Sequence, residues 1–94
     1  LYAQVLTACA QAKKDDLSYF SSSDVREPMS KIMGKAYEIP AFSQHLNDFC
    51  DYDRGPHLVK TGYARRYRFR FCNPLMEPFV LMKGYSSGLI KNLD

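Results

Sequence analysis

The chain lacks several features that would place it in a specialised class of protein. It has no tryptophan and only three cysteines in 94 residues. Cys9, Cys50 and Cys72 are odd in number, widely spaced and set among apolar neighbours, so they provide neither a disulfide framework nor a Cys-x-x-Cys metal clamp. We therefore expect three buried thiols, a reducing cytoplasmic environment and no metal site.

Membrane, nucleotide-binding and catalytic motifs are also missing. No apolar run approaches the roughly 20 residues that cross a bilayer, and residues 1–12 lack the basic start and cleavage site of a signal peptide. Gly34 and Lys35 are followed by Ala36, where a phosphate loop requires Ser or Thr. No Ser-His-Asp or Cys-His grouping has the spacing of a nucleophilic site. We expect a non-enzymatic domain with no membrane contact, no cofactor and no small-molecule substrate.

The sequence does contain enough apolar side chains for one small core. Hydrophobic residues make up 46% of the chain, including seven tyrosines and six phenylalanines. This length suits one domain, which we place over residues 1–94. Because the chain starts at Leu1 and its apolar pattern is already present at Tyr2, we expect it to be a fragment of a larger protein.

Charge is unevenly divided along the chain. Residues 1–53 hold five basic and eight acidic side chains, whereas residues 54–94 hold eight basic and two acidic ones. No acid occurs between Arg54 and Met76. The basic side chains of that segment are Arg54, Lys60, Arg65, Arg66, Arg68 and Arg70. Electrostatic attraction to a partner should therefore be concentrated there.

The first third of the chain predicts two helices separated by a short strand. Apolar and small residues recur at spacings of three and four over residues 2–12, which is typical of a helix. Residues 17–20 are apolar and aromatic and predict a short edge strand. Ser22, Ser23 and Asp24 are three consecutive N-cap candidates, and Asp24 and Glu27 have capping-box spacing. A second helix should therefore start there and end at Gly34.

A third helix is expected after Pro40, which suits a first helical turn. Its predicted inward residues are Phe42, Leu46 and Phe49, spaced four and three apart. The opposite face is polar and contains no Lys or Arg. That face consists of Ser43, Gln44, Asn47 and Asp48.

Two strands and a last helix complete the prediction. Residues 58–61 and 66–71 are expected to form a hairpin joined through Gly62, and the second strand alternates strictly. Its ring-bearing side is Tyr67, Phe69 and Phe71, and its charged side is Arg66, Arg68 and Arg70. Asn73 and Pro74 predict the start of a helix that ends at Gly84, followed by a tail over residues 85–94.

This order predicts an α+β, mainly α, fold: a winged helix-turn-helix. A three-helix core would carry a small antiparallel sheet, made of the short strand and the two-stranded wing, and a C-terminal helix.

The residues also resemble a known family. The resemblance lies in Tyr19-Phe20, Ser23-Asp24-Val25, Phe42-Ser-Gln-His-Leu46 and the block RRYRFRFCNPLMEPFVLMK from Arg65 to Lys83. Together these resemble the C-terminal winged-helix segment of bacterial AAA+/STAND-type ATPases. Those proteins are similar to the origin-recognition ATPases, in which such a domain follows the nucleotide-binding core and touches duplex DNA.

The resemblance implies a DNA-binding role for two segments. The third helix takes the place of the recognition helix and would present Ser43, Gln44 and Asn47 to a major groove. The hairpin takes the place of the wing. Its candidate phosphate contacts are Lys60, Arg65, Arg66, Arg68 and Arg70, since guanidinium groups suit phosphates.

Two readings of the basic wing stay open. Its arginines could meet duplex DNA, or they could be a solvated strand face that pairs with acids or packs over aromatic rings. The corresponding alternative function is a regulatory interaction domain that docks on its own upstream ATPase core or on a protein partner, without DNA.

Overall fold

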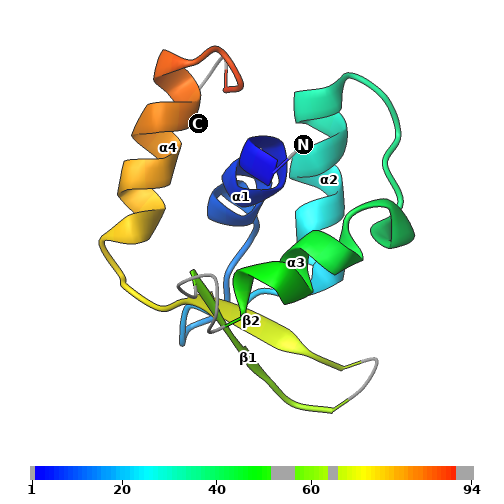
Figure 1. Ribbon diagram of the computed structural model, residues 1–94, viewed down its shortest axis with the longest axis vertical. Coiled ribbons are helices and arrows are strands. Elements are labelled where there is room, and N and C mark those ends of the chain that lie inside the picture. Colours follow the sequence, from blue (N-terminus) through cyan, green and yellow to red (C-terminus); the bar gives the residue numbers. More distant parts are fainter. Residues whose placement is uncertain (1, 52–56, 64–65, 91–94) are drawn as a thin grey trace.

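The computed structural model describes residues 2–51, 57–63 and 66–90 (Figure 1). Helices account for most of these residues, and a two-stranded antiparallel sheet lies between the last two helices in chain order. The elements are α1 (Tyr2–Gln11), α2 (Ser22–Met33), the 3-10 helix η1 (Ile39–Ala41), α3 (Ser43–Phe49), β1 (Leu58–Thr61), β2 (Arg68–Phe71) and α4 (Met76–Ser86).

Helix α1 lies at the centre of the fold and packs against both α2 and α4 (Figure 1). Val5, Ala8 and Cys9 of this helix are fully buried. Thr7 is buried as well, although its side chain is polar. Its hydroxyl donates to the Ala3 carbonyl at 2.7 Å, so the polar group is satisfied within the helix and costs little to bury.

Helix α2 starts at Ser22, with its N-cap one residue before the predicted cap residues. Ser21 is the N-cap residue, in an extended conformation, and its backbone N–H donates to the Asp24 carboxylate at 2.9 Å. The capping box is therefore formed by Ser21 and Asp24, and the prediction that paired Asp24 with Glu27 is wrong. Gly34 ends the helix as predicted, at a φ of 72° that favours glycine.

Helix α3 is short and presents its apolar face to the core. Phe42, Leu46 and Phe49 are buried, which confirms the predicted inward set. Pro40 lies in η1, one turn before α3, so the helical segment begins in tight 3-10 geometry and then continues as an α-helix.

The hairpin pairs β1 with β2 in antiparallel register, and Lys60 lies opposite Phe69. Phe69 and Phe71 are buried, while Arg68 and Arg70 are exposed, as the alternation predicts. The predicted edge strand over residues 17–20 is reduced to one bridge, in which Phe20 exchanges two backbone hydrogen bonds with Phe69. Helices, bridge, hairpin and C-terminal helix together confirm the α+β winged-helix arrangement.

Helix α4 begins at Met76 and runs past its predicted end. Gly84 is buried inside the helix, where a Cβ atom would lie 2.9 Å from Thr7 Cγ2, so this glycine permits close approach of α1 and α4. Ile90 packs over the same point and is buried. The prediction of a loose tail from Tyr85 is therefore wrong up to Ile90, and residues 91–94 lie outside the described part.

The three cysteines differ in environment. Cys9 is buried, Cys50 is half-buried and Cys72 is exposed, so only Cys9 fits the prediction of buried thiols. Burial raises the pKa of the Cys9 and Cys50 thiols, which keeps both protonated near neutral pH. None of the described helices is long and apolar enough to cross a membrane.

Candidate nucleic-acid interface

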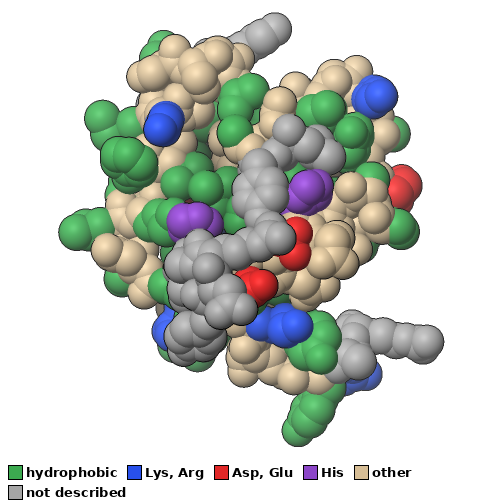
Figure 2. All heavy atoms as spheres, in the orientation of Figure 1, with side chains coloured by type: hydrophobic (Ala, Val, Ile, Leu, Met, Phe, Trp, Pro, Cys, Tyr) green, Lys and Arg blue, Asp and Glu red, His purple; other side chains and the backbone are tan. Residues whose placement is uncertain are grey.

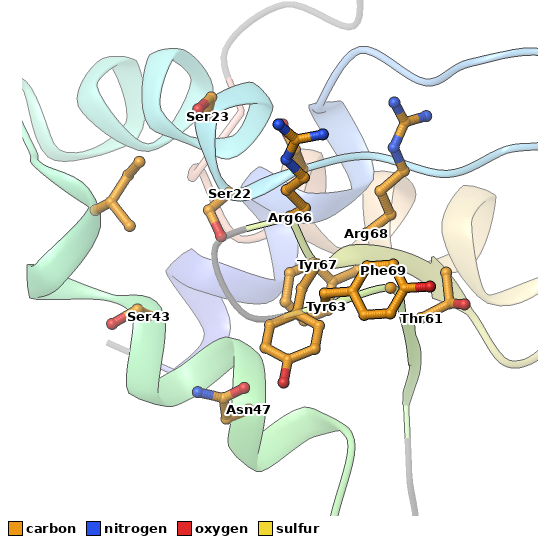
Figure 3. A pocket seen from close by; sticks show the side chains of 13 residues that line it. Ser22, Ser23, Ser43, Asn47, Thr61, Tyr63, Arg66, Tyr67, Arg68 and Phe69 are labelled. Atoms are coloured by element: carbon orange, nitrogen blue, oxygen red, sulfur yellow. The ribbon is translucent and has the colours of Figure 1, made fainter.

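An open groove of about 740 Å³ separates the hairpin from α3 and the start of α2 (Figure 3). Three segments that are distant in sequence form its walls. They are Ser21, Ser22 and Ser23 before and in α2; Ile39, Ser43 and Asn47 of η1 and α3; and Thr61, Gly62, Tyr63, Arg66, Tyr67, Arg68 and Phe69 of the hairpin. The groove lies where a winged helix brings together its wing and its second and third helices.

The charge of the groove has one sign. Among the described residues that line it, Arg66 and Arg68 are the charged ones, and no carboxylate is present. The remaining polar groups are serine and threonine hydroxyls, two phenols and the Asn47 amide. This composition suits an anionic ligand that also offers hydrogen-bonding groups.

Arg66 is the more available of the two arginines. It is exposed and precedes β2, and its backbone N–H donates to the Tyr63 carbonyl at 2.8 Å. Its guanidinium has no side-chain partner among the described residues. In Figure 3 the Arg66 and Arg68 side chains extend in the same direction, with Ser43 and Asn47 across the groove.

Arg68 is paired with a carboxylate. Its Nη1 lies 2.9 Å from Asp15 Oδ2, while Asp15 Oδ1 accepts from the backbone N–H groups of Leu17 and Tyr19. The Tyr19 N–H, with the help of the Leu17 N–H and Arg68, lowers the pKa of Asp15. The Arg68 side chain nevertheless stays 61% exposed, so it remains accessible to a ligand.

Arg70 lies on the same face of β2 as Arg68 but does not line the groove. Its guanidinium stacks over the Tyr19 ring, 5.1 Å from the ring centre. The three arginines therefore differ: one is open, one is paired and one is stacked. The pairing with an acid expected for the row is observed for Arg68, and the packing over an aromatic ring for Arg70.

Lys60 is separated from the arginine row. Because it is opposite Phe69 in the sheet, it lies on the ring-bearing face, whereas Val59 and Thr61 share the face of Arg70 and Arg68. Lys60 Nζ is 3.3 Å from Asn47 Oδ1 and 4.4 Å from the centre of the Tyr67 ring. Tyr67 itself is partly exposed rather than a core residue.

The predicted recognition-helix residues are also divided. Ser43 and Asn47 line the groove, but Gln44 does not, and its Nε2 donates to Asp48 Oδ1 at 3.0 Å. Asp48 likewise does not line the groove. Arg65, like Arg54, lies outside the described residues.

Two features of the groove were missed by the sequence reasoning. The serines that start α2 were considered only as helix caps, although their place beside a basic segment is visible only in the fold. The only sequence signal for Tyr63 was its position directly after Gly62, the residue predicted to join the two strands. No family model, curated protein or solved structure matches the chain, so the site is argued from its geometry.

Proposed function

We propose that this domain is the winged-helix module of a larger ATPase and binds duplex DNA mainly through its basic wing. The observation that carries the proposal is the groove with two arginines and no carboxylate among its described lining residues. Phosphate contacts supply most of the affinity of such modules, and polar side chains on a helix supply base contacts.

Each wall of the groove would have its own part in binding. Arg66 and Arg68 are suited to phosphate oxygens, because a guanidinium presents its donors as a planar fork. Ser43 and Asn47 stand opposite them on α3, where a hydroxyl and an amide could hydrogen-bond base edges. The resemblance of the sequence to the C-terminal winged helix of AAA+/STAND-type ATPases implies the same assignment of wing and helix.

Asp48, near the end of α3, bears on this reading. A carboxylate at the end of a recognition helix would repel phosphates. Asp48 accepts a hydrogen bond from Gln44 on its own helix and is not part of the groove lining. Duplex DNA in the groove would therefore meet Ser43 and Asn47 before it meets this acid.

The test is a fluorescence-anisotropy titration of labelled duplex with the variant Arg66→Ala/Arg68→Ala. Loss of the Arg66 contact, and of the Arg68 contact that Asp15 weakens, should lower affinity for all duplex sequences alike and reduce the salt slope by about one to two. The control is Arg26→Ala, which removes a guanidinium of α2 that is paired with Glu38 and does not line the groove. Unchanged binding in the double variant would refute the proposal.

A second candidate function is favoured by the outer face of α4. Leu75, Phe79 and Met82 are 75%, 63% and 68% exposed and recur at helical spacing. Figure 2 shows hydrophobic side chains over α4 at the left of the view, and Figure 1 places the wing at the bottom. Several exposed apolar side chains on one helix are typical of a protein contact, so docking on an ATPase core or a partner is the alternative.

The two functions separate in one measurement. If the domain binds labelled duplex at low micromolar affinity in physiological salt, the docking role without DNA loses its support. If it does not, the apolar face of α4 becomes the main candidate for function.

A further inference from the structure

The tip of the wing carries a tyrosine ring that is 81% exposed. Tyr63 is the most exposed of the large hydrophobic side chains in the described part of the chain. Gly62 precedes it with a φ of 99°, and a Cβ atom at this position would lie 2.7 Å from the Arg66 carbonyl oxygen. The chain thus turns tightly here, and this turn leaves the Tyr63 ring in solvent.

Two basic residues lie near the tip of the wing. The Arg66 backbone N–H donates to the Tyr63 carbonyl at 2.8 Å, while the Arg66 side chain extends in the same direction as that of Arg68 (Figure 3). On the ring-bearing face, Lys60 Nζ lies 4.4 Å from the centre of the Tyr67 ring. The wing tip therefore combines two tyrosines with two cations.

This combination has a specific use in nucleic-acid recognition. Aromatic rings stack on the faces of unpaired bases, and neighbouring cations hold the phosphates on either side. The base pairs of a continuous duplex offer only their edges to a protein, whereas a base at a strand end or beside a melted pair exposes a face. The ring at the tip has nothing to stack on in an undisturbed helix.

Building on the proposed DNA-binding function, we propose that the wing tip is a stacking site for an unpaired base next to duplex DNA. Tyr63 stacks on the first unpaired base, and Arg66 and Lys60 hold its flanking phosphates. The groove side of the wing, through Arg68, contacts the adjoining duplex. The preferred ligand is therefore a junction of double-stranded and single-stranded DNA.

The test compares a blunt duplex of about 20 base pairs, the same duplex with a 5′ or a 3′ overhang, and the single strand. The first unpaired position holds 2-aminopurine, whose fluorescence reports stacking. The variants are Tyr63→Ala, Tyr63→Phe, which keeps the ring, and Tyr85→Ala as a control that removes a half-exposed tyrosine from α4. Circular dichroism checks that each variant is folded.

We expect one of the overhang duplexes to bind at least about fivefold more tightly than the blunt duplex and to quench the 2-aminopurine signal. Tyr63→Ala should abolish the preference for the overhang duplex and the quenching, whereas Tyr63→Phe and Tyr85→Ala should retain both.

Two kinds of result would overturn the inference, and only the second would also overturn the proposed DNA-binding function. Equal binding of blunt and overhang duplexes, or equal losses for Tyr63→Ala on all DNAs, would overturn the stacking site alone. Failure of every DNA to bind would overturn it together with the proposed function.

Discussion

Replacing Asp15 with asparagine is expected to tighten DNA binding by freeing a wing arginine. In Asp15→Asn the Oδ1 atom still accepts from the Leu17 and Tyr19 N–H groups, so the local turn is kept. The Oδ2 atom becomes an NH₂ group facing the Arg68 guanidinium, and the 2.9 Å ion pair is lost. The substitution thus removes the carboxylate that competes with phosphate and changes little else.

The size of the effect follows from the number of phosphate contacts. One added contact steepens the dependence of log K on log salt by about 0.9. The gain in affinity over the parent is therefore up to about eightfold larger at 0.1 M than at 1 M salt. Because Arg68 is already 61% exposed, the pair is partly screened and the measured gain should fall below this value.

The assay is an anisotropy titration of labelled duplex at several salt concentrations. Asp16→Asn is the matched control, because it changes the net charge by the same unit at an exposed neighbouring acid. Asp15→Asn should exceed this control in both affinity and salt slope. Equal gains for the two variants would show a general charge effect, and no gain for Asp15→Asn would mean that Arg68 does not contact DNA.

Two further predictions concern stability. Gly84→Ala should lower the free energy of unfolding by about 1 kcal/mol, because crowding against Thr7 and Ile90 outweighs the better helix propensity of alanine. Urea unfolding measures this difference. A Gly84→Ala protein that is more stable than the parent would contradict the close packing of α1 and α4 at this residue. The pKa of the Asp15 carboxyl is lower in the folded chain than its unfolded value of about 3.8, so the ionised carboxylate stabilises the fold at pH values above 3.8. This stabilisation is lost as the pH falls through the folded pKa. The difference in urea midpoint between the parent and Asp15→Asn should therefore shrink below about pH 4, and a difference that stays constant would exclude this source.

Local patterns were sufficient for most elements of the fold. The alternation of Phe69 and Phe71 with Arg68 and Arg70 predicted β2, and the spacing of the apolar side chains predicted α3. These signals are strong because burial on one face fixes the period of a strand or a helix. Details that depend on a second element were not predictable. Gly84 looked like a helix end, since the sequence does not show that α1 crosses α4 at that residue.

The site depended even more on long-range geometry. Lys60 was grouped with the arginines because it shares their segment, but the register of the hairpin places it on the opposite face. A shift of one residue in strand pairing would reverse that assignment, and sequence alone does not fix it. The ion pair of Arg68 joins residues 53 positions apart, which no local pattern reports.

The central claim is that DNA lies in the groove between the wing, α3 and the start of α2. Its most direct test is a titration of the ¹⁵N-labelled chain with unlabelled duplex, followed by backbone amide shifts. Shifts concentrated at Ser22, Ser43, Asn47, Gly62 and Arg66, with α4 unaffected, are the predicted result. Shifts confined to α4, or none at stoichiometric duplex, would contradict the account.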